Sequence, residues 1–329
     1  MNRASSDAGA RALNVARPTA RVEQETGTLE RKLRAGQRVV IVEARPPEGP
    51  DLTPLVQAAE TLAEWIDAIQ LTDMPFATPH IANWAAGAQL KQLGHEVVLN
   101  LSCRDRNTIA QQGTLLGAAA LGIQNFFCIR GDDPSVGDHP HSCGVFETSG
   151  LQLVSLAKRL RSDSAYASGR RYQPAPALFV GAALAPHARY GEDANELARR
   201  KMQAGADFLV TQPLCDTETL PRLRAQVPEL FERCFVLAGV GPVTTLAALE
   251  ALSASSELLV PDQLAKQLRA AAPTRRAQLG MDVALAVAES ALAAGAHGIL
   301  IYPFDCSVEQ TREFAQSVRG RMTATTRSG

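Results

Sequence analysis

Short apolar segments rich in Val, Ile and Leu alternate with amphipathic segments along most of this chain, and this alternation restricts the possible fold more than any single motif. The clearest unit runs from Glu96 to Pro134. It begins with E-V-V-L-N-L-S-C and a polar turn, continues with apolar residues at helical spacing, and ends with N-F-F-C-I-R-G-D-D-P. This pattern predicts a strand, a helix and a second strand. Strands joined in this way are parallel, so the segment is a βαβ unit.

The same unit recurs along the chain. Besides the two strands of that unit, strands are predicted at 38–44, 68–72, 177–183, 207–211, 235–239 and 298–302. Further helices are predicted at 25–34, 53–65, 84–93, 151–160, 195–203, 218–225, 244–252, 261–271 and 283–293. Uniform alternation over eight strands predicts α/β architecture, a single (β/α)8 TIM barrel with an N-terminal lead-in helix and an extra helix after strand 7. A doubly wound open sheet is the alternative.

Length and composition are compatible with one large domain. The chain has 329 residues, and its 46% hydrophobic content is enough to bury one core. We predict a disordered N-terminal tail at 1–23, the barrel domain at 24–320 and a flexible C-terminal tail at 321–329. The first residues lack the apolar core of a secretory signal. They are rich in arginine, as organellar transit peptides are, but a disordered tail is favoured because chain termini are commonly disordered.

Charge and cysteine usage narrow the class of partner. A formal net charge of −1 with both signs interspersed offers no basic stripe for nucleic acid, and no apolar run has the roughly 18 residues of a membrane span. Six scattered cysteines without a C-x-x-C pair indicate reduced thiols. We therefore expect a cytoplasmic protein that binds small molecules, with no nucleic-acid or membrane partner.

Polar residues collect immediately after the predicted strands, where the active sites of (β/α)8 barrels lie. They are Glu43, Thr72, Asp73, Asn100, Asp132, His187, Gln212 and Asp305. Glu43 ends an otherwise apolar run. A carboxyl partly enclosed by barrel walls has a raised pKa and can act as a general acid near neutral pH. The alternative for Glu43 is a rim carboxylate paired with a neighbouring arginine.

Asp132 follows Gly131, which allows the backbone to approach a ligand closely, and it stands in a turn-forming D-D-P sequence. One interpretation is a turn or capping aspartate. The other is a carboxylate that faces a ring system which becomes cationic during the reaction. A second carboxylate near Glu43 would also push the two pKa values apart. One of the two groups would then stay protonated as an acid while the other is an anion.

Three further patterns are weaker. The triplet Arg199-Arg200-Lys201 indicates either a solvated helix face or a phosphate site, and G-V-G-P-V-T at 239–244 either a tight barrel loop or a phosphate cradle. D-H-P-H-S-C at 138–143 lacks the usual zinc spacing, so no metal site is predicted. Neither G-x-G-x-x-G nor a G-x-S-x-G elbow occurs in the chain.

Several of these motifs, taken in order, resemble the methylenetetrahydrofolate reductase family. The resemblance covers the chain from about Val39 to Phe314. Its anchors are V-E-A-R-P-P, L-T-D, N-L-S-C-R-D-R-N, R-G-D-D-P-S-x-G-D-H-P, A-P-H and R-K-M-Q-A-G-A-D-F-L-V-T-Q. Each motif is short, and their order along the chain supplies the specificity.

The resemblance implies a flavoprotein on a (β/α)8 barrel that reduces 5,10-methylenetetrahydrofolate to 5-methyltetrahydrofolate, a step that supplies methyl groups for methionine biosynthesis. Hydride would pass from NADH or NADPH to FAD and then to the folate. Glu43 would protonate the folate, Asp132 would tune the flavin and stabilise the cation, and Gln212 would hold the pterin. The residues matched to FAD binding are Thr72, Asn100, Arg130, Gly131, Asp132, His187, Arg200 and Lys201.

The chain also departs from the family pattern. Asn100 stands where many members have histidine, and Ala183 and Leu246 stand near positions that are often aromatic. A flavin-independent reductase that uses NADH directly is therefore one alternative. A non-catalytic accessory barrel of a one-carbon enzyme is another. By analogy with the family we expect a homo-oligomer.

Overall fold

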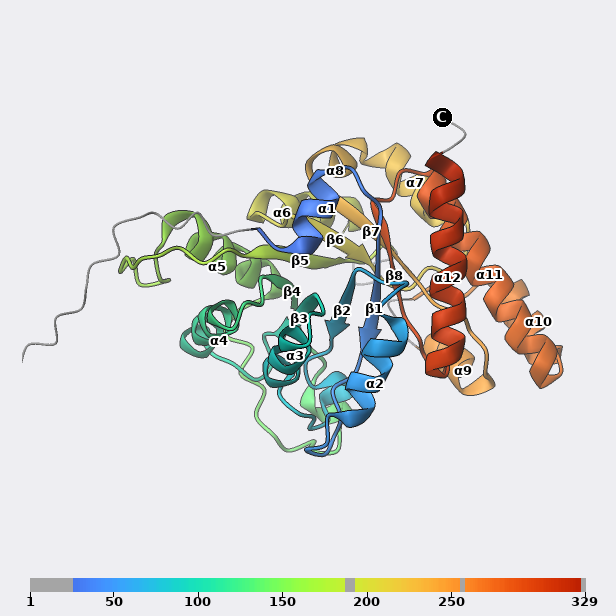
Figure 1. Cartoon of the computed structure of the whole chain (residues 1–329), viewed down its shortest axis with the longest axis horizontal. Coiled ribbons are helices and arrows are strands. Elements are labelled where there is room, and N and C mark those ends of the chain that lie inside the picture. The colour runs from blue at the N-terminus through green and yellow to red at the C-terminus, as the bar shows by residue number, and fades with distance from the viewer. Residues whose placement is uncertain (1–25, 187–192, 255–257, 327–329) are drawn as a thin grey trace, which may run out of the picture.

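Eight parallel strands close into a barrel in the order of the sequence, and helices surround it (Figure 1). The structure is a computed structural model that describes residues 26–186, 193–254 and 258–326. The predicted (β/α)8 barrel is confirmed, and the open doubly wound sheet is excluded because β8 pairs with β1. The strands are β1 (Val39–Ala44), β2 (Ala68–Leu71), β3 (Val97–Ser102), β4 (Asn125–Ile129), β5 (Phe179–Leu184), β6 (Phe208–Thr211), β7 (Phe235–Val240) and β8 (Gly298–Ile301).

Most helices lie where the sequence predicts them, with local differences in extent, and the helices at 228–233 and 308–326 were not predicted. They are α1 (Thr28–Arg34), α2 (Thr53–Leu62), α3 (Asn83–Gln92), α4 (Thr108–Ala120), α5 (Gly150–Asp163), α6 (Ala194–Ala204), α7 (Thr219–Gln226), α8 (Pro228–Arg233), α9 (Leu246–Ala254), α10 (Asp262–Ala270), α11 (Pro273–Ala293) and α12 (Val308–Thr326). Two short 3-10 turns, η1 (Pro75–Ala77) and η2 (Pro134–Val136), follow β2 and β4. The extra helix after strand 7 is α10. The helix α12 extends past residue 320, the predicted end of the barrel domain.

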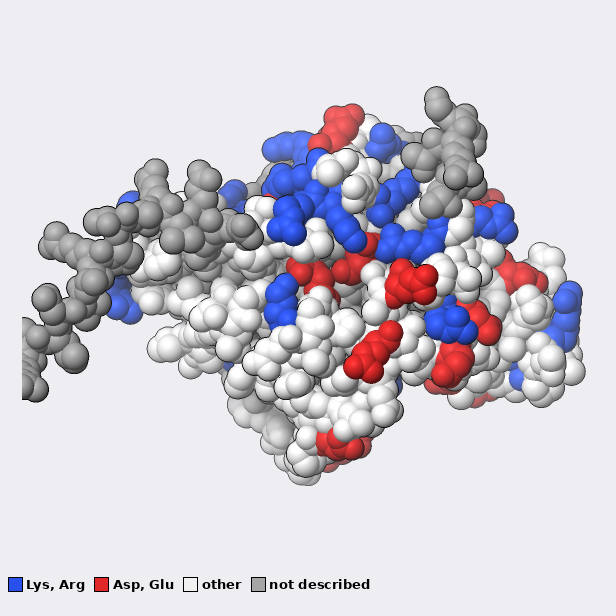
Figure 2. All heavy atoms as spheres, viewed as in Figure 1, with Lys and Arg blue, Asp and Glu red and all other residues white. Residues whose placement is uncertain are grey.

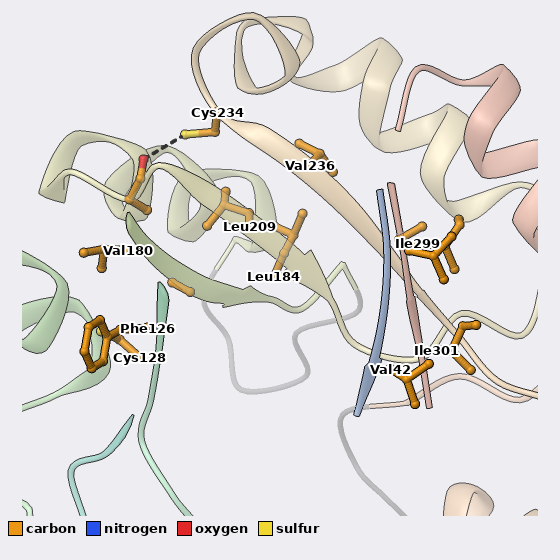
Figure 3. Packing of buried hydrophobic residues seen from close by; sticks show 14 of the residues in the cluster. Val42, Phe126, Cys128, Val180, Leu184, Leu209, Cys234, Val236, Ile299 and Ile301 are labelled. Atoms are coloured by element: carbon orange, nitrogen blue, oxygen red, sulfur yellow. Dashed lines mark hydrogen bonds between the residues drawn. The ribbon is translucent and has the colours of Figure 1, made fainter. Parts of the chain in front are cut away.

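The strands bury both faces, as expected for a parallel sheet. Outward-facing side chains such as Val42, Val180 and Ile299 pack against the surrounding helices (Figure 3). The same layer holds Cys234, whose thiol donates to the carbonyl of Ala206. This layer fixes the ring of helices to the barrel.

Inward-facing side chains fill the barrel near the amino ends of the strands. The rings of Phe127 and Phe179 stack against Phe208 at centroid distances of 6.2 and 5.0 Å. Gly181 provides the room, because a Cβ atom there would lie 2.2 Å from the Phe208 ring. The helix α1 packs Leu29 and Leu33 into the same inner cluster and closes the N-terminal end. The carboxyl end of the strands is therefore where polar groups can face a ligand.

Buried carboxylates tie the closed end together. Asp67 accepts hydrogen bonds from the backbone N–H of Val40 at 2.7 Å and from Lys32 Nζ at 2.5 Å, and it pairs with Arg319 of α12. Asp207 plays the same part for β5 and α5, with the N–H of Val180 and the guanidinium of Arg161. Asp67 and Asp207 immediately precede β2 and β6, so these pairs lie at the amino ends of the strands, away from the carboxyl ends, and support the fold.

On the face shown in Figure 2, charged side chains of both signs lie mostly in the upper and right-hand parts, and few lie over α3 and α4. Within the described residues, no helix combines the length and the apolar character that a bilayer span requires.

Candidate functional site

The register of the barrel brings the predicted strand-end residues to one end of the barrel. Glu43 pairs with Gln70, Thr72 follows β2, and Asn100 lies opposite Phe127. Parallel partners in register point to the same face, and Phe127 belongs to the inner cluster. Glu43, Thr72 and Asn100 therefore face the interior near the carboxyl end, as the sequence predicts.

Glu43 combines burial with access to the mouth of the barrel. Its side chain is half-buried, and the four residues before it in β1 are fully buried. Burial raises the pKa of the Glu43 carboxyl from the usual 4.5 to about 7, and the positive charge of Arg45 partly opposes this rise. A carboxyl with a pKa near 7 can hold a proton at neutral pH and release it. Glu43 thus has the property expected of a general acid.

Two residues near the carboxyl ends of β2 and β3 each carry a buried polar atom that has no hydrogen-bond partner within the described part of the chain. The atoms are Thr72 Oγ1 and Asn100 Oδ1, and their residues are only 7% and 5% exposed. A buried polar atom without a partner costs about 1–3 kcal/mol. Binding of a ligand with complementary hydrogen-bonding groups would recover that cost.

Charged residues that follow β2 and β3 hydrogen-bond to one another and to the backbone of the adjoining loops. Asp73, whose side chain is fully buried, accepts from the backbone N–H of Ser102 at 2.8 Å and from Arg106 at 2.6 Å. Arg104 is 2% exposed and donates to Asp105 and to the carbonyl of Met74, each at 2.9 Å. Asp73 is thus engaged in holding β2 and β3 together, whereas its neighbour Thr72 faces the interior.

The R-G-D-D segment follows β4. Gly131 has φ +85°, and a Cβ atom there would lie 3.0 Å from the Cβ of Ser102 and 3.1 Å from that of Arg104, so glycine is required. Asp132 is exposed and accepts from the backbone N–H of Phe76 at 2.9 Å. Asp133 instead caps η2 by accepting from the N–H of Ser135. The two adjacent aspartates therefore have different partners.

The loop after β2 has an unusual backbone at this end of the barrel. Met74, Phe76 and Ala77 have φ values of 47°, 55° and 53°, in the left-handed region that costs energy for residues with a side chain. The Phe76 ring is 57% exposed, and the guanidinium of Arg45 lies 4.8 Å from its centroid. The contact with Asp132 holds this loop to the R-G-D-D segment.

The cations of the α6 triplet point in different directions, as the helix geometry predicts. Arg199 pairs with Glu229 of α8 at 2.9 Å, and Arg200 is exposed on the same helix. Lys201 donates to the carbonyl of Ala183, in β5, at 2.5 Å. His187 lies outside the described residues. Arg130 follows β4 and stacks over the ring of Phe146 at 4.6 Å.

Gln212 immediately follows β6 and is half-buried, with its backbone N–H donating to the carbonyl of Leu184 at 2.8 Å.

The two glycines of G-V-G-P, Gly239 and Gly241, lie where the backbone packs too closely against its neighbours to leave room for a side chain. A Cβ atom on Gly239 would lie 2.4 Å from the carbonyl of Thr211, and one on Gly241 would lie 2.1 Å from that of Tyr302. The tight barrel loop accounts for both positions.

Sequence reasoning missed two residues next to Glu43. Tyr302 follows β8, and burial raises its pKa well above the usual 10, with a further contribution from the negative charge of Glu43. Gln70 lies beside Glu43 in the ladder and is 0% exposed. The strand-end rule could have found Tyr302, whereas Gln70 lies within a strand and gave no such signal. Among the described residues, no cluster of three or more His, Cys, Asp or Glu side chains could hold a metal ion.

Comparison with solved structures supports the same architecture. A protein from Clostridium thermocellum, described as binding two copies of 5-methyl-5,6,7,8-tetrahydrofolic acid, is similar with a TM-score of 0.61 and 12% identity over 90% of this chain and 99% of that one. The EDTA monooxygenase of a Chelativorans species has a TM-score of 0.55 and 12% identity over 88% and 94% of the two chains. At such identities the likeness concerns the fold.

Sequence comparison is more specific. The chain is 23% identical over 203 residues to methylenetetrahydrofolate reductase 2 of Schizosaccharomyces pombe, which covers 56% of this chain and 30% of that protein. It is also 23% identical over 210 residues to methylenetetrahydrofolate reductase (NADH) 1 of Zea mays, which covers 63% and 35%. The chain spans about a third of the length of these relatives. The model of the family described as methylenetetrahydrofolate reductase matches residues 28–313, so the chain belongs to that family.

Proposed function

We propose that the protein reduces 5,10-methylenetetrahydrofolate to 5-methyltetrahydrofolate with NADH or NADPH as the hydride source and with FAD as cofactor. The observation that carries this proposal is Glu43, a half-buried carboxyl at the end of β1 whose pKa is raised to about 7. The reaction needs a proton on a folate nitrogen to open the five-membered ring. A binding scaffold without catalysis has no need of such an acid.

Three residues of the candidate site have defined roles in this proposed reaction. Glu43 delivers its proton to the folate nitrogen and is left as a carboxylate, while the ring opens to an iminium cation. The Asp132 carboxylate stabilises that cation, and Gln212 holds the pterin. The cation then takes up hydride at the one-carbon unit to give the methyl group. One proton and one hydride are consumed, and NAD(P)⁺ is the other product.

The residues at the mouth fit a bound flavin in several respects. Thr72 Oγ1 and Asn100 Oδ1 are buried atoms with free hydrogen-bonding capacity, and Gly131 lets the backbone approach a flat ring. Thr72, Asn100, Arg130, Gly131 and Asp132 would hold the cofactor from β2, β3 and β4, with His187, Arg200 and Lys201 from the region after β5. Bound FAD would accept hydride from the nicotinamide and return it to the folate.

Purified protein incubated with FAD and then desalted is expected to retain visible flavin absorbance and to reduce the folate with NADH. Ala183 and Leu246 provide no ring to stack on the flavin, but stacking adds only about 0.5–1.5 kcal/mol, so its loss weakens binding by roughly tenfold. Equal turnover with and without FAD would establish direct hydride transfer. A protein that is inert in both states would be an accessory barrel.

Asp132→Asn is expected to raise the midpoint potential of bound flavin and to slow folate reduction. The anion opposes the gain of negative charge on reduction, and a charge at an exposed rim contributes roughly 1 kcal/mol, equivalent to about 20 mV for a two-electron couple. The asparagine can still accept from the N–H of Phe76, so the loop stays in place. Potentiometry on the flavin-loaded protein provides the measurement.

Asp133→Asn is the matched control for this charge. It removes the same charge one residue away, from a carboxylate whose partner is Ser135 of η2. The potential of Asp133→Asn should stay close to that of the parent protein. Equal potentials in all three proteins would identify Asp132 as a turn aspartate that only anchors Phe76.

Association between copies of the chain is also part of the proposal. The surface over α3 and α4 is nearly free of charged side chains (Figure 2). In or directly after these two helices, Trp84, Leu93, Ile109 and Leu121 are 43–79% exposed. Contact between copies across this face would remove these side chains from water. Light scattering at defined protein concentrations measures the oligomeric state.

A further inference from the structure

Gln70 is the polar side chain whose position the fold explains least. It lies in the middle of β2, is 0% exposed, and neither Nε2 nor Oε1 has a hydrogen-bond partner within the part of the chain that the structure describes. Buried amides are nearly always hydrogen-bonded, and an apolar residue at this position would stabilise the barrel. A role in chemistry would account for the amide.

The position of Gln70 in the strand ladder makes Glu43 the candidate partner of its amide. Gln70 is the register partner of Glu43, and Val98, its partner on the other side, belongs to the inner cluster. Neighbouring strands are about 4.8 Å apart, so a change of rotamer brings the amide within hydrogen-bond distance of the carboxyl. Glu43 is partly exposed at the mouth, whereas Gln70 is fully enclosed. Gln70 can therefore contact Glu43 without contacting a ligand.

The other groups around Glu43 leave this role open. Arg45, on the same strand end, contributes positive charge but lies over the exposed Phe76 ring. Tyr302 approaches from β8, and its hydroxyl is 3.5 Å from the carbonyl of Thr211. From β2 the neighbours are neutral, namely Gln70 and Thr72. No hydrogen bond joins the Glu43 carboxyl to another side chain among the described residues.

We propose that Gln70 is a positioning residue, whose amide N–H donates to the Glu43 carboxylate and holds the carboxyl toward the mouth of the barrel. When Glu43 is protonated, Gln70 Oε1 can accept its O–H instead, so the pair stays bonded before and after proton delivery. The catalytic consequence rests on the proposed function, but the bond itself does not. The amide also limits how far burial raises the Glu43 pKa, since a bond to the anion favours the charged form.

The test replaces Gln70 with methionine, which has similar volume and flexibility and no amide. The titration of Glu43 is followed by ¹³C NMR or infrared difference spectroscopy on the ligand-free protein, with Glu43→Gln variants to assign the signal. The expected result is a rise in the Glu43 pKa by about one to two units, the usual effect of one hydrogen bond to a charged group. The alkaline limb of the folate-reduction pH profile, where activity declines as Glu43 loses its proton, should move to higher pH by the same amount.

A matched control is Gln111→Met. Gln111 is also 0% exposed, but it lies in α4 and its amide bonds to the carbonyl of Arg106 and to Thr148. This variant should lose stability to urea and leave the Glu43 titration unchanged. Gln70→Met, in contrast, should stay close to the parent protein in stability, because methionine replaces a buried amide whose one proposed partner is Glu43 with an apolar side chain of similar volume. If Gln70→Met does not fold, Gln70→Leu supplies the same measurement.

The outcomes separate this inference from the proposed function. An unchanged or lowered Glu43 pKa in Gln70→Met overturns the inference, even if the parent protein reduces folate. A raised Glu43 pKa in a protein that reduces no folate in any form keeps the hydrogen-bonded pair and overturns the proposed function. A raised pKa together with a shifted pH profile supports both.

Discussion

Replacing Glu43 with glutamine is expected to lower folate reduction by at least two orders of magnitude while the barrel remains intact. General acid catalysis contributes about 10²–10⁴-fold, and glutamine has the same shape but cannot deliver a proton. Reduction of bound flavin by the nicotinamide needs no proton from this residue and should persist. Stopped-flow measurement of the two half-reactions separates these effects.

The proposed activity of the parent protein should depend on pH through the ionisation of Glu43. In the proposed function Glu43 acts in its protonated form, and burial raises its pKa to about 7. Folate reduction should therefore be full below pH 7 and decline as the pH rises through that value. The exposed Glu48 on the following loop is the control, and Glu48→Gln should keep both the rate and the profile. Equal slowing of both half-reactions in Glu43→Gln would remove the assignment of Glu43 as the acid.

Much of the fold could be predicted because parallel strands buried on both faces leave a strong signal. R-V-V-I-V-E-A and the seven later apolar runs all became barrel strands. The helices were harder. Val227-Pro228 separates α7 from α8, and the sequence predicts one helix there instead of two. The predicted helix starts at residue 283, whereas α11 begins ten residues earlier, at Pro273. Proline is favoured at the first position of a helix, because its fixed φ suits the helix and its missing N–H would have no partner there.

The candidate site was partly predictable by the same logic. The rule that polar residues gather at the carboxyl ends of barrel strands found Glu43, Thr72 and Asn100, which the register brings to one end. It could not say which member of the pair Thr72-Asp73 faces the interior, because that depends on the stagger of neighbouring strands. It also missed Gln70. In a strand buried on both faces, periodicity does not distinguish an inward residue from an outward one.

The stability of the protein should also change with pH through Glu43, in the opposite direction to that of most carboxylates. The folded state binds this proton more tightly than the unfolded chain, because the folded pKa is about 7 and the usual value is 4.5. The resulting contribution to stability is full below about pH 4.5, declines between pH 4.5 and 7, and is lost above pH 7. The difference in pKa corresponds to about 3 kcal/mol of unfolding free energy.

Glu43→Gln removes this titration and keeps the neutral shape of the acid. The variant should match the parent protein near pH 4.5 and exceed its unfolding free energy by up to about 3 kcal/mol at pH 8, where the parent holds a buried anion. Urea denaturation at a series of pH values between 4.5 and 8.5 measures the difference, with Glu48→Gln as the exposed control. A constant difference across this range would mean that folding does not raise the pKa of Glu43, which would remove the basis for its assignment as a general acid. A protein that gains stability and loses folate reduction through the same substitution would show that the buried carboxyl is retained for its chemistry.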